Sequence, residues 1–431
     1  MRSPLVTRRF VPALLAAASA VLAIAPPARA DLDAATRTKL FETVWKRVRD
    51  THYDPTFGGL DWDKVRATYG PKIRAAKSDS ATFALLRAMI GELKLSHFEI
   101  IPADTTVDSG RSHGDGDPGL TISLIEGKAV ITAVEEGSPA ATAGVKPGSV
   151  VVAIDDRKLA PMLSRIHARK TKPAREQVEV RGMTRSLLSG AVGKPVKLEL
   201  EGGQTSFVDR RAPKGERSGV GNLEGVPAFV ESRVLPGGWG YLRFNVFLVD
   251  PSMALIRSAI EGFAAVPGLI IDLRGNPGGV GGMAPGIVGM LTPKGRDDRN
   301  LGTMKMRGGE IKFAINPQPP YYSGPVAVLV DEMSLSTSEI LAGGLQESGR
   351  AVVVGRATGG MVLPSNIEKL PGGALFQYAV ADFRTPKGVL LEGRGVLPDI
   401  PVSLTRSRLS AGGDPILEAA VAALQSKVPT R

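Results

Sequence analysis

The stretches LIIDLRGNPGG (residues 269–279) and VAVLVDEMSLSTSEI (residues 326–340) decide the fold. Each begins with an apolar run of the length of a buried strand and then passes into glycine, asparagine or serine. A helix is predicted over residues 338–345 and a further strand over residues 351–354. Strands that alternate with helices predict an α/β domain with a mainly parallel sheet. Chemistry in such sheets gathers beyond the carboxyl ends of the strands, where both stretches become polar.

The polar ends of these stretches contain candidate catalytic groups. Ser336 directly precedes the predicted helix, where free main-chain N–H groups and the helix dipole favour developing negative charge. Gly278 and Gly279 can turn main-chain N–H groups into a cleft, because glycine adopts dihedral angles closed to other residues. These features suit an oxyanion site. The alternative is that Ser334, Ser336 and Ser338 merely cap the helix.

Three further regions are predicted before the α/β core that contains these stretches. Residues 31–103 have helical apolar periodicity, as in the face Leu40, Phe41, Val44, Trp45 and Val48. A Gly-, Asp- and Ser-rich boundary at residues 104–116 opens a second region, 104–210, of short strands and glycine turns, interrupted by a charged insertion at residues 157–185. Residues 211–431 form the α/β core. Residues 1–30 are a separate segment.

That first segment has the pattern of a cleaved secretory signal. Arg2, Arg8 and Arg9 precede an apolar run at residues 11–24, and Ala28-Arg29-Ala30 supplies small residues for cleavage. The run is shorter than the roughly 20 residues that span a bilayer, so an uncleaved anchor is the less favoured alternative. The mature chain is therefore predicted to be exported, to the periplasm or the medium, without a transmembrane anchor. The Arg8-Arg9 pair leaves Sec and twin-arginine export both open.

Composition excludes several kinds of chemistry. The 431 residues include no cysteine, which excludes disulfides, cysteine nucleophiles and thiolate metal sites. Only four histidines are present, so a metal centre built from several histidines is not expected. The net charge of +11 falls to +7 without residues 1–30, and it is spread without a long basic run. No nucleic-acid partner is inferred from it.

The second region resembles a PDZ domain of the kind associated with bacterial proteases. The likeness rests on the segment GSPAATAGVKPGSVV at residues 137–151, in which Ser149 replaces the usual acid. PDZ domains add a peptide strand to an exposed sheet edge and capture its carboxylate in a neighbouring loop. The resemblance assigns that loop and edge to Gly119, Leu120, Thr121 and Ile122. The alternative is an unrelated small β domain.

The two opening stretches resemble the tail-specific, or C-terminal processing, serine peptidases and their tricorn-core relatives. DLRGNPGG and SLSTSEILAGGLQESGRAVVVG occur in order, about fifty residues apart, and LEGRGVLPDIPV follows near the C-terminus. The likeness covers almost all of the mature chain and implies a ClpP/crotonase-like α/β core. It also implies Ser336 as nucleophile, with the amides of Gly278 and Thr337 as oxyanion donors and Gly279 as the neighbouring alternative.

The general base distinguishes two branches of this family. The processing branch uses a lysine in a Thr-Phe-Gly-Lys-Gly run, but here the run is Thr-Gly-Gly-Met-Val at residues 358–362, and Met361 cannot accept a proton. The tricorn-like branch uses a histidine in a Leu-x-x-Ser-His context and a glutamate near the C-terminus. By that resemblance His97 is the base and Glu392 or Ser96 supports its imidazole. The other three histidines, His52, His113 and His167, are interpreted as solvated.

The sequence therefore predicts an exported serine peptidase that cleaves peptide bonds through an acyl-enzyme, without metal or organic cofactor. Its partner would be a protein or peptide substrate, and the PDZ-like domain would bind the substrate C-terminus or gate the cleft. One alternative is a catalytically silent peptide- or ligand-binding protein on the same scaffold. Another is a hydrolase that acts on a non-peptide ester or amide with the same serine. The sequence specifies neither the substrate nor the oligomeric state.

Overall fold

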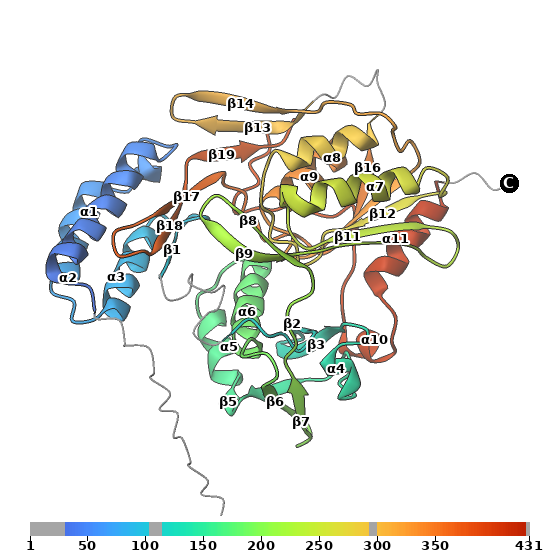
Figure 1. The fold of residues 1–431 in the computed structure, drawn as a ribbon, viewed down its shortest axis with the longest axis horizontal. Helices are drawn as coiled ribbons and strands as arrows, with labels where there is room; N and C mark the ends of the chain where they lie inside the picture. The colour runs from blue at the N-terminus through green and yellow to red at the C-terminus, as the bar shows by residue number, and fades with distance from the viewer. Residues whose placement is uncertain (1–30, 103–113, 293–299, 428–431) are drawn as a thin grey trace, which may run out of the picture.

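A computed structural model describes residues 31–102, 114–292 and 300–427, so the predicted signal segment and His113 lie outside the described residues. Figure 1 shows three parts: a group of N-terminal helices, a small module of strands and helices below, and a larger α/β core. The fold is mixed α/β, as predicted. No helix in the described ranges combines the length and apolarity needed to cross a bilayer.

The N-terminal part contains α1 (Ala34–Thr51), α2 (Trp62–Arg74) and α3 (Asp79–Gly91), with a short 3₁₀ helix η1 (Phe57–Gly59) between the first two. Ser78 caps α3 by accepting the Ala81 N–H. The predicted apolar face of α1 is buried against a sheet ordered β1 (Glu99–Ile101), β18 (Leu375–Ala379), β17 (Ser365–Lys369). This packing fixes the segment between α3 and β1 beside C-terminal strands.

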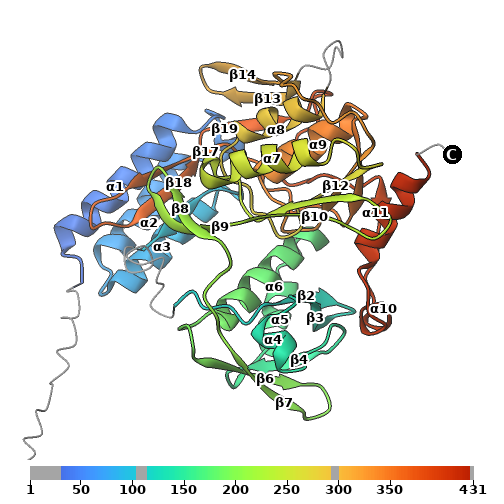
Figure 2. The ribbon, with the colours of Figure 1, turned by 45° about the vertical axis from the view of Figure 1, so that its right-hand side comes forward.

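The small module forms around a separate apolar cluster. The hairpin of β2 (Leu120–Ile125) and β3 (Lys128–Val134) packs with a sheet of β4 (Val151–Ile154), β5 (Arg157–Lys158), β6 (Pro195–Leu200) and β7 (Thr205–Asp209). A short helix α4 (Pro139–Thr142) follows β3. The charged insertion forms α5 (Ala160–His167) and α6 (Pro173–Leu188). In Figure 2, α6 lies between this module's strands and the α/β core.

A six-stranded sheet forms the core, in the order β10, β11, β12, β15, β16, β20, which are Val230–Val234, Gly240–Phe244, Leu269–Asp272, Val326–Val330, Ala351–Gly355 and Ile400–Pro401. All neighbouring pairs are parallel except β10 with β11. Helices α7 (Ala254–Gly262), α8 (Met283–Leu291) and α9 (Thr337–Glu347) belong to one apolar layer, and α11 (Pro415–Gln425) covers the opposite face. The carboxyl ends of β12 and β15 therefore lie side by side.

The remaining elements surround this sheet. A π-helical turn η3 (Val249–Met253) precedes α7, and α10 (Arg406–Ser410) precedes α11. One hairpin joins β8 (Glu216–Val220) to β9 (Leu223–Ala228). A three-stranded sheet of β14 (Gly309–Ala314), β13 (Asn300–Met306) and β19 (Ala381–Arg384) lies at the top of Figure 1.

Candidate functional site

Ser336 occupies a strained turn between β15 and α9. Its φ of 55° lies in the left-handed region, which non-glycine residues seldom adopt. Its N–H lies 2.9 Å from the Met361 carbonyl oxygen and 3.0 Å from Glu339 Oε2. These two acceptors hold the main chain in place. The Ser336 side chain is partly exposed, whereas Ser334 and Ser338 are fully buried.

The two buried serines hold this turn against the end of β12. Ser334 Oγ donates to the Leu273 carbonyl at 2.8 Å, and Ser338 Oγ donates to the Asn276 carbonyl at 2.9 Å. Neither hydroxyl is used to cap α9. Their bonds bring the two stretches that decide the fold into contact, with Ser336 turned toward the open side.

Gly278 lies directly against the Ser336 turn. A Cβ placed on Gly278 would come within 2.8 Å of Ser336 Cβ and 2.9 Å of Thr337 N, so no larger residue fits. The Gly278 N–H, however, donates to Asn276 Oδ1 at 2.9 Å. Among the described residues, the N–H groups of Gly279 and Thr337 have no hydrogen-bond partner. The geometry therefore favours Gly279 over Gly278 as the partner of Thr337 in an oxyanion site.

Ser96, His97 and Glu392 form a connected relay. Ser96 Oγ donates to Glu392 Oε2 at 2.8 Å, the Ser96 N–H donates to Glu392 Oε1 at 2.8 Å, and His97 Nδ1 lies 2.7 Å from Ser96 Oγ. The hydroxyl hydrogen of Ser96 is used in the hydrogen bond to Glu392. Ser96 Oγ therefore acts as the acceptor toward His97, and Nδ1 of His97 carries the proton that it donates to Ser96 Oγ. Nε2 then keeps a free lone pair, which is the arrangement a general base requires.

Burial and charge keep the imidazole neutral. Burial, with the positive charge of Arg175 on α6, lowers the pKa of His97 to about 4. At neutral pH the ring is therefore neutral, with Nε2 able to accept a proton. The φ of 58° at His97 shows a second left-handed residue in the site, positioned by the segment between α3 and β1.

Residues 361 and 362 connect the serine turn to this relay. The Met361 carbonyl accepts the Ser336 N–H, and the Val362 N–H donates to Glu392 Oε2 at 2.9 Å. Met361 thus contributes to the site through its main-chain carbonyl. A lysine does approach the neighbouring loop: the Lys172 amine donates to the carbonyl of Gly393, the residue after Glu392, at 2.7 Å.

Glu339 is a member of the site that the sequence analysis missed. Its side chain is fully buried at the start of α9, three residues after Ser336. Burial raises its pKa to about 7, against the lowering effect of hydrogen bonds from Thr358, Met361, Ser336 and Gly360. An acidic residue three positions after a serine is the sequence pattern of a capping box, and that pattern could have identified it.

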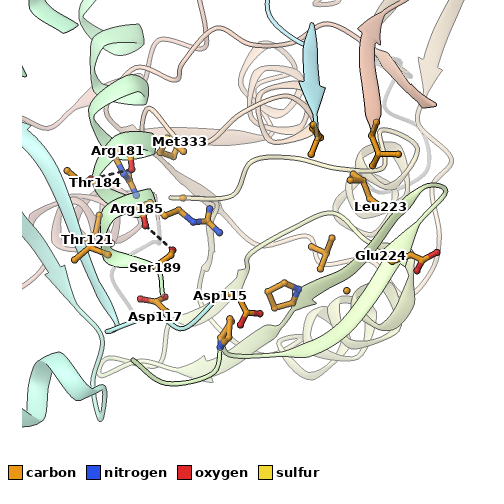
Figure 3. Close-up of a pocket in the computed structure, with 18 of the residues that line it drawn as sticks. Asp115, Asp117, Thr121, Arg181, Thr184, Arg185, Ser189, Leu223, Glu224 and Met333 are labelled. Atoms are coloured by element: carbon orange, nitrogen blue, oxygen red, sulfur yellow. Dashed lines mark hydrogen bonds between the residues drawn. The ribbon is translucent and has the colours of Figure 1, made fainter. Parts of the chain in front are cut away.

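A cavity of about 700 Å³ opens between the small module and the core (Figure 3). Leu120, Thr121 and Ile122 of β2 line it on one side, and α6 and the β8–β9 hairpin line others. It reaches Gly275 and Met333, which lead to Gly278 and Ser336 respectively. Gly119 is not among its lining residues, and the Gly119 N–H donates to Asp117 Oδ1 at 2.8 Å.

Helix α6 occupies part of the outer edge of β2. The Leu124 N–H donates to Gln177 Oε1 at 3.0 Å, and Gln177 Nε2 donates back to the Leu124 carbonyl at 2.5 Å. This carboxamide on α6 therefore occupies the groups that a bound peptide strand would use. Leu124 lies two positions beyond the predicted edge at residues 119–122, and its groups are occupied because the charged insertion folds back as a helix along the strand.

Helix α6 also joins the module to the core. Arg181 pairs with Asp331, and both side chains are nearly buried. Asp331 also accepts the N–H groups of Gly275 at 2.9 Å and Met333 at 3.0 Å. Burial alone would raise the pKa of Asp331, but the charge of Arg181, with that of Arg356, lowers it to about 2. The same helix thus contacts the PDZ edge and the base of the Ser336 turn.

The remaining histidines divide between core and surface. The interpretation of His52 as solvated is wrong, because its side chain is 1% exposed and stacks on Tyr53 and Phe98. Its aromatic neighbours lie next to it in the chain, on η1 and immediately before β1. His167 is exposed and pairs with Glu176, as expected for a surface residue. No cluster of three or more metal-ligating side chains occurs in the described ranges.

Comparisons with known proteins match all three parts of the chain. The model of peptidase family S41 matches residues 238–402, that of the tricorn protease C1 domain matches residues 33–91, and that of the PDZ domain matches residues 130–181. The carboxyl-terminal-processing peptidase 3 of Arabidopsis thaliana chloroplasts is 28% identical over 88% of this chain and 71% of its own length. The carboxyl-terminal-processing protease of Synechocystis is 26% identical over 84% of this chain and 80% of its own.

Solved structures support the same fold. The photosystem II D1 C-terminal processing protease superposes with a TM-score of 0.57 at 23% identity, covering 89% of this chain and 97% of that one. The tricorn protease superposes with a TM-score of 0.53 at 16% identity, covering 92% of this chain and 37% of that one. Family models and relatives agree on a serine protease: residues 238–402 belong to peptidase family S41, residues 33–91 match the tricorn protease C1 domain, residues 130–181 match the PDZ domain, and the relatives that cover most of the chain are carboxyl-terminal-processing proteases.

Proposed function

We propose that this serine protease uses a serine–histidine mechanism, with Ser336 as nucleophile and His97 as general base. The observation that carries the proposal is the Glu392–Ser96–His97 relay, which is joined through residues 361–362 to the main chain of Ser336. A neutral imidazole with its Nδ1 proton held by Ser96 leaves Nε2 free to accept a proton. Met361 in place of the family's lysine removes the competing base.

The proposed reaction proceeds in two halves. Ser336 Oγ attacks the scissile carbonyl carbon while its proton passes to His97 Nε2, and the N–H groups of Gly279 and Thr337 stabilise the oxyanion. His97 then protonates the leaving amine, and the C–N bond breaks to leave an acyl-enzyme. Water, deprotonated by His97, hydrolyses the ester and restores Ser336.

We further propose that the protein is exported and that its PDZ domain binds the substrate's C-terminus. The signal-like residues 1–30 support export. The cavity lined by Leu120, Thr121 and Ile122 supports the binding role, because it extends from the PDZ strand toward the segments that carry Gly278 and Ser336. A C-terminus held there would lead its chain toward the nucleophile. Helix α6, which contacts both, would couple binding to access.

Covalent labelling tests the mechanism. A serine-directed fluorophosphonate is expected to label the wild-type protein, and mass spectrometry of the peptides is expected to locate the adduct on Ser336. Ser336→Ala removes labelling and peptide cleavage together, while Ser186→Ala, an exposed serine on α6, changes neither. Peptide cleavage that persists in Ser336→Ala would contradict the proposal. Peptide binding without labelling or cleavage would favour a silent binding protein.

A further inference from the structure

The segment at residues 360–362 presents three successive main-chain N–H groups to two carboxylates. The Gly360 N–H donates to Glu339 Oε1 at 2.9 Å and the Met361 N–H donates to Glu339 Oε2 at 3.0 Å. The next N–H, that of Val362, donates to Glu392 Oε2 at 2.9 Å. One carboxylate belongs to the helix that follows the nucleophile, and the other belongs to the relay that orients His97. The segment therefore has a bond to each half of the site.

Glu339 gathers further groups at the same point. Its Oε2 also accepts the Ser336 N–H at 3.0 Å, and its Oε1 accepts the Thr358 hydroxyl at 2.5 Å. Thr358 Oγ1 in turn accepts the Val396 N–H at 2.7 Å, so its hydroxyl proton is committed to Glu339. All four acceptor positions of the carboxylate are thus occupied by donors. A neutral amide or acid at this position cannot accept from all four.

We infer that residues 360–362 form a main-chain bracket that sets the spacing between Ser336 and His97, and that Glu339 is the positioning residue that holds the bracket to the nucleophile. The inference rests on the proposed function of Ser336 and His97. The inference gives a structural role to residues 358–362, the run in which the other branch of the family carries its lysine. Here the main chain of Met361, and not its side chain, forms the hydrogen bonds of the site.

Substitution of Glu339 tests the bracket. Glu339→Gln replaces one acceptor oxygen with an NH₂ group that faces N–H donors, so the turn and the bracket separate. We expect kcat to fall about 100-fold, with KM within about threefold of wild type, because the substrate contacts remain. Phosphonate labelling of Ser336 is expected to slow by a similar factor. Glu261→Gln, the same change at an exposed glutamate on α7, is expected to retain kcat within about threefold.

The pH profile separates positioning from a general loss of structure. The groups that face Glu339 are neutral: three main-chain N–H groups and the Thr358 hydroxyl. Its protonation near pH 7 would place a proton against one of these donors. Wild-type kcat is therefore expected to fall as the pH drops through about 7, and Glu339→Gln is expected to lack that limb. A wild-type kcat in Glu339→Gln, or an equal loss in Glu261→Gln, overturns the inference.

Thr358 supplies a second, milder test if Glu339→Gln does not fold. Thr358→Val removes one of the four donors and is expected to lower kcat about 10-fold at constant KM, while Thr358→Ser keeps the hydroxyl and restores it. Equal kcat values in the two variants overturn the inference. The proposed function fails separately: wild-type protein that phosphonate does not label at Ser336 contradicts the mechanism, whereas normal labelling with unaffected Glu339 and Thr358 variants contradicts only the bracket.

Discussion

Helix α6 contacts both the Ser336 turn and the PDZ groove, which is the cavity lined by Leu120, Thr121 and Ile122. The two regions differ in how firmly their main chain is held. The turn is held by Glu339, Ser334 and Ser338, which are fully buried and hydrogen-bonded to main-chain groups of neighbouring segments. The groove is an open cavity whose strand edge is bonded to two side chains of α6, the partly buried Gln177 at Leu124 and Thr184, whose hydroxyl lies 3.4 Å from the Ile122 carbonyl. One region has its geometry fixed before substrate arrives, and the other has contacts that a ligand can replace.

This difference matches what each part of the proposed function requires. Catalytic groups act only within a narrow range of distances, so buried main-chain bonds are suited to hold them. Peptide capture requires a strand edge that can exchange one partner for another. Helix α6 touches both regions through Gln177 and Arg181, so it is the element through which they can influence each other.

The largest expected effect lies on the catalytic side. His97→Ala removes the proposed base and is expected to lower kcat by roughly 10⁴-fold, measured by hydrolysis of a fluorogenic peptide. Met361→Lys in the His97→Ala background is not expected to restore activity, because Met361 is used through its main chain. His167→Ala, a change at an exposed histidine, is the control. More than a tenth of wild-type activity in His97→Ala would make a different base necessary.

The Arg181–Asp331 ion pair, which joins α6 to the base of the Ser336 turn, is expected to stabilise the folded state. Arg181→Met leaves Asp331 buried without its partner, so the free energy of unfolding is expected to fall by about 3 kcal/mol, measured by urea denaturation. Asp331→Asn added to Arg181→Met is expected to recover part of that loss. Arg169→Met removes the exposed pair with Glu179 and is expected to cost less than about 1 kcal/mol. Equal losses in the two single variants would show that the Arg181 pair is not a stabilising joint.

Acid is expected to weaken the folded state through His97. Its folded-state pKa of about 4 lies below the ordinary 6.5, so the folded state binds fewer protons than the unfolded chain between these values. The stability contributed by the neutral ring is present above pH 6.5 and is lost as the pH falls through 4, by up to about 3 kcal/mol. The stability difference between wild type and His97→Gln, followed by thermal unfolding from pH 7 to 4, measures this. A difference that stays constant contradicts it.

The smallest expected effect concerns the groove. Gln177→Ala frees the Leu124 N–H and carbonyl, so a labelled peptide chosen from a C-terminal library is expected to bind about 10-fold more tightly in the Ser336→Ala background. Fluorescence anisotropy measures the affinity, and the C-terminally amidated peptide tests carboxylate capture. Ser186→Ala on the same helix should bind as the parent does. Unchanged affinity in Gln177→Ala would mean that peptides do not use this edge.

Local sequence was enough to predict the strand ends that carry Gly278 and Ser336, because buried strands and helix starts have strong short-range patterns. It was not enough to distinguish the two glycines, since the choice depends on Asn276 accepting the Gly278 N–H. It also missed Glu339, whose four hydrogen bonds come mostly from residues that lie about twenty positions later. The burial of His52 escaped for the same reason: aromatic residues from separate segments surround it.

The sequence by itself determined which chemistry is available. It has a serine before a helix, four histidines, no cysteine, and a methionine at the position where the processing branch of the family has its lysine base. Only the tertiary structure decided how these groups are joined. Ser96 and Glu392 are 296 positions apart, and no local pattern encodes the bonds between them. Such contacts arise because burying the helical face of α1 and α3 against β18 brings the N-terminal helical region beside strands near the C-terminus, where hydrogen bonding of buried polar groups fixes the final geometry.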